Sequence, residues 1–364
     1  AVNNLTITSD VITSNEMIAN NDLIISASEL TSNDMIAGNK LNISATDFLI
    51  NNNDILSLTT NLLGEDDLII NTAALTNKGR IAANSNVKIN TLSLSNEGVT
   101  SSIRGNDLVI VSTTSIANAG TIEAVNNLTI TSDVVSSNEM IANNDLSISA
   151  RELTSYDMIA GNKLNISATD FLINNNDILS LTTNLLGEDE LAEDSLVINT
   201  VTLTNKGRIA ANGNLKIDTT TLTSVGVTSS IRGNDLAIIS TTSIANEGTF
   251  EAVNNLTITS DVVTSHEMIA NNDLTITTRE LTSDDMIAGN KLNISATDFL
   301  INNNDILSLT TNLLGEDESS ENSLIINTAT LTNKGRIAAN GNLQIDTTTL
   351  TNEGVTSSIR GNDL

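Results

Sequence analysis

Short segments recur along the whole chain, each made of two apolar residues separated by one residue that is often polar. In the first part of the chain they begin at Leu5, Leu23, Leu41, Leu68, Val87 and Leu108, with Ile two positions later. The spacings up to the restart at Leu128 are 18, 18, 27, 19, 21 and 20 residues. Such alternation is typical of a half-buried β-strand, so each triplet predicts a short strand with both apolar side chains on one face.

Two further apolar positions follow each triplet before the next one begins. In the first stretch they are Ile12 and Ile18, separated by polar residues. Three short strands joined by polar corners make one coil of a solenoid, and stacked coils bury an apolar face that a single coil leaves exposed. The pattern predicts an all-β chain. We expect a right-handed parallel β-helix, or β-solenoid, of about 17 coils of 18–21 residues with one longer coil per repeat unit.

The polar corners share a short motif in which Asn is followed two positions later by Gly. Examples are Asn77-Lys78-Gly79, Asn96-Glu97-Gly98 and Asn118-Ala119-Gly120. Because glycine adopts positive φ without steric cost, the motif predicts a tight corner with a left-handed residue at the glycine. The first coils of each unit lack this glycine, and there the pattern places Glu16 at the glycine's position.

The coils are organised in long tandem repeats. The run AVNNLTITSD at Ala1 returns unchanged at Ala124 and Ala252, and residues 158–190 are identical to residues 286–318. We therefore interpret residues 1–364 as one continuous β-solenoid fragment with internal units 1–123, 124–251 and 252–364, the last incomplete. The sequence begins and stops within the pattern, which indicates a piece of a longer protein.

Composition narrows the possible partners. The chain has four Phe, one Tyr and no Trp, Cys or Pro, so its core depends on aliphatic side chains and has no disulfide framework or thiolate metal site. Its formal charge of −28 disfavours nucleic acid and anionic membrane surfaces, which bind basic patches. No apolar run reaches the roughly 18 residues of a membrane span, so membrane insertion is not expected. No cofactor motif is present.

The corner motif also carries a family resemblance. The pattern L-x-N-x-G-x-I-x-A in LTNKGRIAA, at Leu75, Leu203 and Leu331, resembles the haemagglutinin repeats of filamentous haemagglutinin-like exoproteins. That family comprises bacterial adhesins of two-partner secretion, including contact-dependent inhibition stalks. The resemblance implies a secreted, cell-surface virulence protein. It further implies export through an outer-membrane two-partner secretion transporter and binding to a receptor on a host or neighbouring cell.

Candidate chemistry is sparse. His266 is the only histidine and replaces Asn15 and Asn138 at one corner, which favours structural drift over catalysis, since a general base needs partners. The longer coil of each unit carries an acidic loop, such as LLGEDELAEDSL at Leu185. We interpret this loop as a solvated segment or, alternatively, as a weak cation site. The candidate ligands in the second unit are Glu188, Asp189, Glu193 and Asp194.

Methionine occupies one recurrent place in the coil. Each methionine precedes the third apolar residue, and by alternation this predicts an outward side chain. The sequence thus predicts either partly buried corner fillers or an apolar patch for partner contact, formed by Met17, Met35, Met140, Met158, Met268 and Met286.

Three functions are conceivable for such a solenoid. The sequence favours a structural or adhesive rod segment of a secreted bacterial surface filament, without catalytic, cofactor or metal residues. The alternative is a β-helix enzyme acting on polysaccharide. Ice binding by flat Thr-x-Thr arrays fits Thr6 and Thr8, but fails at the adjacent coils, where Ile24 and Ser26 take their places.

Overall fold

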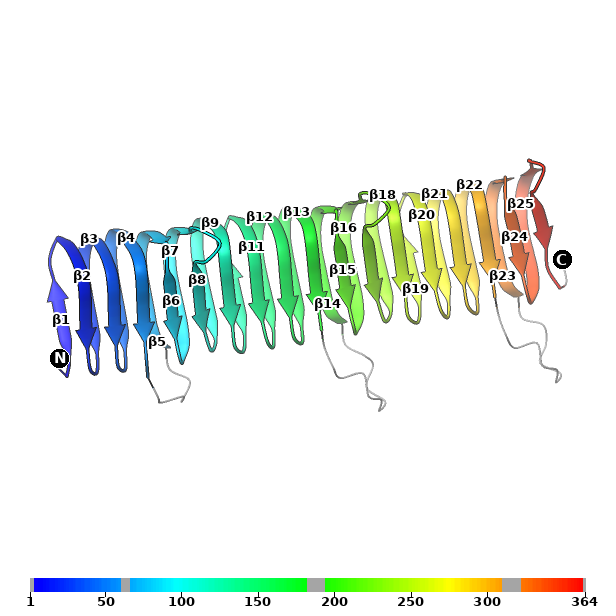
Figure 1. Cartoon of the computed structure of the whole chain (residues 1–364). Coiled ribbons are helices and arrows are strands. Elements are labelled where there is room, and N and C mark those ends of the chain that lie inside the picture. The colour runs from blue at the N-terminus through cyan, green and yellow to red at the C-terminus, as the bar shows by residue number, and fades with distance from the viewer. Residues whose placement is uncertain (1–2, 60–65, 182–193, 310–321, 363–364) are drawn as a thin grey trace. The chain divides into compact units, whose positions relative to one another are not determined.

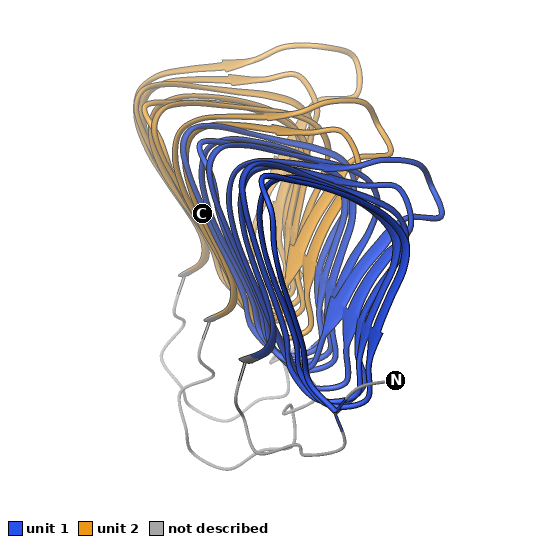
Figure 2. Ribbon diagram, turned by 90° about the vertical axis from the view of Figure 1, so that its left-hand side faces the viewer, with its two compact units in different colours: residues 1–181 blue, residues 182–364 orange. Residues whose placement is uncertain are grey.

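The computed structural model describes residues 3–59, 66–181, 194–309 and 322–362. These residues form two compact units, 1–181 and 182–364, shown in blue and orange in Figure 2. Both units consist of β-strands that follow one another around successive coils, labelled in Figure 1. Among the described residues there is no helix that could cross a membrane.

The strands are short where a corner interrupts them and long where the chain bends without breaking the hydrogen-bond pattern. In unit 1 they are β1 (Leu5–Thr8), β2 (Val11–Ala19), β3 (Leu23–Ala37), β4 (Leu41–Ser57), β5 (Asp66–Asn77), β6 (Arg80–Ala83), β7 (Asn86–Asn96), β8 (Ser102–Gly105), β9 (Leu108–Ala124), β10 (Leu128–Thr131), β11 (Val134–Ala142), β12 (Leu146–Ala160) and β13 (Leu164–Ser180).

Unit 2 repeats this order. Its strands are β14 (Asp194–Asn205), β15 (Arg208–Ala211), β16 (Asn214–Ser224), β17 (Ser230–Gly233), β18 (Leu236–Ala252), β19 (Leu256–Thr259), β20 (Val262–Ala270), β21 (Leu274–Ala288), β22 (Leu292–Ser308), β23 (Asn322–Asn333), β24 (Arg336–Ala339), β25 (Asn342–Asn352) and β26 (Ser358–Arg360).

Each strand pairs in parallel with the strand one coil before it and one coil after it. Leu128 of β10 lies beside Leu146 of β12, and Leu146 lies beside Leu164 of β13. Equivalent residues of successive coils therefore stack directly on each other. The predicted fold, a right-handed parallel β-helix, is confirmed.

The core is a set of aliphatic ladders that run through the stacked coils. β12 bends twice and so supplies all three sides of one coil, which correspond to the three strands expected from the sequence. Its first side contributes Leu146 and Ile148, its second Leu153 and its third Met158 and Ala160, and all five side chains are buried. Full burial of one Leu, Ile or Met side chain contributes about 1.5–3 kcal/mol. A chain with few aromatic residues thus builds its core by repetition.

The third strand of the first coils differs from the sequence prediction by one residue. All six methionines are buried, with Met17 5% exposed and the other five fully enclosed, whereas Ile18 is 39% exposed. The cause is a shorter corner: Ser137 lies beside Asn118 and Glu139 beside Thr121, so one residue is missing relative to the Asn-x-Gly corner. A shift of one residue exchanges the two faces of a strand. The predicted outward methionine patch is therefore wrong.

The same register corrects the position of Glu16. Glu16 pairs with Asp34, Asp34 with Asp54, and Asp54 with Arg80. Glu16 thus occupies the column of Arg80 and not that of the corner glycine.

The corner glycines serve two different purposes. A Cβ at Gly120 would lie 2.0 Å from the carbonyl oxygen of Ser101, so the backbone of the neighbouring coil excludes any side chain there. Gly79, Gly248 and Gly335 are equally crowded. Among the described residues only Gly98, Gly226 and Gly354 have positive φ. The prediction of positive φ is correct for these three and wrong for the crowded ones.

The corner asparagines form a buried hydrogen-bonded ladder that the sequence did not reveal. The Nδ2 of Asn51 donates to Oδ1 of Asn77 at 2.7 Å, Asn77 donates to Asn96 at 2.6 Å, and Asn96 donates to Asn118 at 2.6 Å. The ladder ends with Asn118 donating to Oγ of Ser137 at 2.9 Å. The side-chain NH₂ group of each asparagine thereby donates a hydrogen bond to the buried side-chain oxygen of the next residue in the ladder.

These observations separate two glycine positions experimentally. We expect Gly120→Asn to destabilise the chain by several kcal/mol, because no rotamer relieves a backbone clash. Gly98→Asn should cost about 1 kcal/mol or less, because its φ of 92° tolerates Asn and its surroundings are open. Denaturant unfolding of both variants provides the measurement. Equal losses would contradict the assignment of Gly120 to close coil contact.

Candidate functional site

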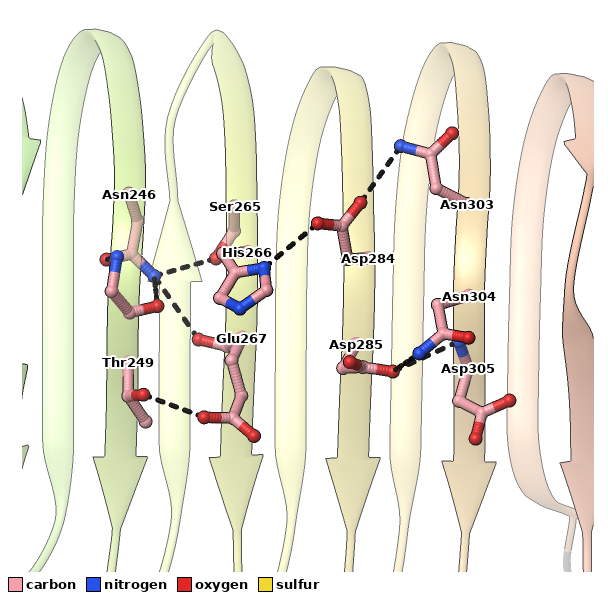
Figure 3. A network of polar contacts seen from close by, with 11 residues as sticks. Asn246, Thr249, Ser265, His266, Glu267, Asp284, Asp285, Asn303, Asn304 and Asp305 are labelled. Atoms are coloured by element: carbon pink, nitrogen blue, oxygen red, sulfur yellow. Dashed lines mark hydrogen bonds and ion pairs between the residues drawn. The ribbon is translucent and has the colours of Figure 1, made fainter. Parts of the chain in front are cut away.

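A row of carboxylates follows the third strands of neighbouring coils on the outer face. In unit 2 it consists of Glu267 on β20, Asp285 on β21 and Asp305 on β22, which lie side by side in the sheet. Figure 3 shows these residues along successive strands. We call this row the acidic strip.

Neutral donors and one arginine contact the acidic strip. Thr249 donates its hydroxyl proton to Oε2 of Glu267 at 2.7 Å, and Asn304 donates from Nδ2 to Oδ1 of Asp285 at 2.7 Å. Arg336 forms an ion pair with Asp305 at 2.7 Å. The strip therefore keeps an excess of negative charge on an open face.

Equivalent acidic strips occur earlier in the chain. One is formed by Glu16, Asp34 and Asp54, and another by Glu139, Asp157 and Asp177. In the first of these, Arg80 pairs with Asp54 at 3.0 Å, as Arg336 does with Asp305.

His266 lies beside the acidic strip of unit 2. Its Nδ1 is 2.9 Å from Oδ2 of Asp284, and Asp284 also accepts a hydrogen bond from Asn303 at 3.2 Å (Figure 3). The hydrogen bond to Asp284 raises the pKa of His266 above its ordinary value, although slight burial opposes this. The imidazole is 49% exposed. The imidazole thus contacts one carboxylate on an exposed surface.

Two arginine clusters join carboxylates of neighbouring coils at the corner between the first and second sides of the coil. Arg151 contacts Asp133 at 2.8 Å, Asp170 at 2.9 Å and the adjacent Glu152. Its hydrogen bond holds the pKa of Asp133 below the usual value. Arg279 repeats the arrangement with Asp261, Glu280 and Asp298.

The first repeat lacks this arginine. Ser28 stands at the place of Arg151, since the backbone N–H of each donates to the preceding Asp, Asp10 or Asp133. The equivalent carboxylates Asp10, Glu29 and Asp47 thus have no arginine between them. Like charges so placed repel each other.

The predicted cation ligands fall at the limit of what the structure describes. Glu188, Asp189 and Glu193 lie outside the described residues. Asp194 begins β14, with its backbone beside Asn214, and its side chain is not described. Within the described ranges, no group of three or more His, Asp or Glu side chains is arranged to hold a metal ion.

One shallow hollow in the described part of the chain has a volume of about 170 Å³. Its lining includes Leu56, Leu58, Arg80 and Arg104. Both guanidinium groups are already paired, Arg80 with Asp54 and Arg104 with Glu123 at 3.4 Å. The hollow thus offers apolar contact beside neutralised charges.

Comparison with known proteins gave no match to a family model, a curated protein or a solved structure.

The missing arginine of the first repeat predicts a gain of stability. Ser28→Arg should raise the midpoint of thermal unfolding, and Arg151→Ser should lower it, because one cation relieves three carboxylates. Ser28→Gln provides the size-matched neutral control. Since the folded-state pKa of Asp133 is lowered, the effect of Arg151 is present above the unfolded pKa of about 3.9 and fades as pH falls through the folded value. No difference between Ser28→Arg and Ser28→Gln would contradict this.

His266 predicts a pH dependence of the opposite sign. Because its folded-state pKa is raised, its stabilising contribution is complete below the unfolded pKa of about 6.5 and is lost as pH rises through the folded value. Unfolding of wild type and His266→Asn should therefore differ more at pH 5 than at pH 8.5. Asp284→Asn should reduce this pH dependence, leaving the smaller effect of Glu267 and Asp285. A difference that grows with pH would contradict a raised pKa for His266 in the folded state.

Proposed function

We propose that this chain is a structural and adhesive segment of a large secreted bacterial surface filament, similar to filamentous haemagglutinin-like exoproteins. The observation that carries the proposal is the ladder arrangement of the polar side chains. Corner amides such as Asn77 and carboxylates such as Asp285 each bond to the adjacent coil. Groups used in this way hold coils together and present a repeated surface.

In this proposal the chain reaches the cell surface through an outer-membrane transporter of two-partner secretion. There it binds a receptor on a host or neighbouring cell. Repeated copies of one weak site on one chain bind a surface more tightly than a single copy, because later contacts form at high effective concentration. The three tandem repeats, residues 1–123, 124–251 and 252–364, supply such copies, so no single site has to bind strongly.

A polysaccharide-acting enzyme is the second candidate, favoured by one observation. Neighbouring carboxylates of the acidic strip, such as Glu267 and Asp285, lie on adjacent strands, and parallel strands are about 4.8 Å apart. Retaining glycosidases use carboxyl pairs about 5–5.5 Å apart. The strip, however, lies on an open face, and glycosidase chemistry also requires a carboxylic acid with a raised pKa.

The scaffold and the enzyme predict different responses to deletion. Removing residues 124–251 joins Glu123 to Ala252 in register, so the shortened chain should fold and its largest dimension should fall by roughly a third. Extending the deletion to residue 256 breaks the register and provides the control. Small-angle scattering and circular dichroism measure both. Attachment to a receptor-bearing surface should become weaker, without being lost, when one tandem repeat is removed.

An enzyme would respond differently. It would release new reducing or unsaturated ends from neutral, acidic or amino polysaccharides, and Glu267→Gln, Asp285→Asn or Asp305→Asn would abolish the release while the fold persists. Cleavage lost on one such change would overturn the scaffold proposal.

A further inference from the structure

An aliphatic row accompanies each acidic strip. In the second repeat Ile141 pairs with Ile159, and Ile159 pairs with Leu179. These residues follow Glu139, Asp157 and Asp177 by two positions on the same strands, so both rows face outwards. Leu181, 43% exposed, extends the row beyond the end of β13. We call these four apolar residues the aliphatic strip.

The other repeats carry the same aliphatic strip. Its members are Ile18, Ile36, Leu56 and Leu58 in the first repeat and Ile269, Ile287, Leu307 and Leu309 in the third. Leu56 and Leu307 are only 9% and 8% exposed, so the accessible apolar surface there comes from the other members. Leu58 and Leu309 are 45% and 43% exposed. The shortened corner that turned methionine inwards therefore placed isoleucine outwards in each repeat. Ile18 is 39% exposed and the other outward isoleucines are partly exposed, so these side chains form part of the surface.

The two strips form one amphipathic surface of defined spacing. Residues two apart on a strand are separated by about 6.7 Å, and neighbouring strands by about 4.8 Å. An α-helix lying across the strands presents one apolar residue per turn of about 5.4 Å. Over three strands the mismatch is about 1 Å, so apolar residues of the helix can follow the aliphatic strip while side chains beside them reach the acidic strip.

Charge decides what this surface binds. The acidic strip of the second repeat holds three carboxylates, and the chain as a whole carries −28. A second copy would place carboxylates against carboxylates, and an anionic lipid surface would meet the same repulsion. A partner with Lys or Arg at one edge of an apolar face is complementary to both strips.

We propose that each repeat docks a basic amphipathic helix of a partner protein across its third strands. Apolar residues of the helix pack on the aliphatic strip and its cations pair with the acidic strip. The inference rests on the proposed adhesive function and specifies the chemistry of the partner. It assigns one site to residues 16–58, one to residues 139–181 and one to residues 267–309.

The test uses a synthetic helical peptide of about 18 residues with Leu on one face and Lys along one edge. Isothermal titration of the whole chain should find three peptides per chain, with affinity that falls as salt rises. Two peptides control for specificity: one with Glu in place of Lys, and one of the same composition with its residues scrambled. Neither should bind. Equal binding of the scrambled peptide would overturn the proposal, because it would show that the surface binds any cationic peptide and does not recognise an amphipathic helix.

Variants of one repeat give the sharper readout. Glu139→Gln, Asp157→Asn and Asp177→Asn together should lower the stoichiometry from three peptides to two. The matched control removes three exposed carboxylates from other faces, namely Asp47→Asn, Asp218→Asn and Asp346→Asn, and should leave three.

A second variant tests the apolar contact. Ile141→Thr with Ile159→Thr should weaken one site about tenfold and leave the salt dependence of the others unchanged. Thermal unfolding establishes that each variant folds. Three undiminished sites in both strip variants would refute the docking surface. Because the deletion and polysaccharide assays do not involve the peptide, they judge the proposed function independently.

Discussion

Every other feature of this protein depends on the parallel hydrogen bonding that places each residue beside its equivalent one coil away. Because parallel pairing fixes which residue stacks on which, the length of a corner decides which residues of the strand after it face inwards. The corner Ser137-Asn138-Glu139 is one residue shorter than Asn118-Ala119-Gly120-Thr121. This single difference buries Met140 and turns Ile141 outwards. The methionine core and the aliphatic strip have the same origin.

The strands that contain the Leu-x-Ile triplets could be predicted because apolar residues alternate along them and the pattern is repeated many times. Leu146 and Ile148 are buried as the triplets predict. The third strand could not be placed in this way, since Met140 and Ile141 are both apolar and only the corner length decides between them. Likewise the sequence shows that Gly120 is required without showing whether φ or the carbonyl of Ser101 requires it.

The candidate site was less accessible to sequence reasoning because its members come from different coils. Asp285 and Glu267 are neighbours only after the register is known. The same holds for Arg151, whose partners Asp133 and Asp170 lie on the coils before and after it. Comparing the three repeats position by position was the signal available. It would have shown Ser28 in place of an arginine, together with three acidic residues at fixed offsets.

The acidity of the chain is compatible with its stability because many carboxylates accept hydrogen bonds along the stack. Asp145 accepts from the side chain of Asn162 at 2.8 Å and from the backbone N–H of Lys163 at 3.1 Å. Such bonds favour the charged form without requiring a cation. In the acidic strip of the third repeat Glu267 and Asp285 also have hydroxyl or amide donors, yet they stay on an open face beside aliphatic side chains. Differences among the repeats at this face, such as His266 and Tyr156, fall on the outward corner column, while the neighbouring inward positions, such as Ser155 and Ser265, stay buried. A solenoid can vary that column without disturbing the ladders, and recognition can therefore change while the fold does not.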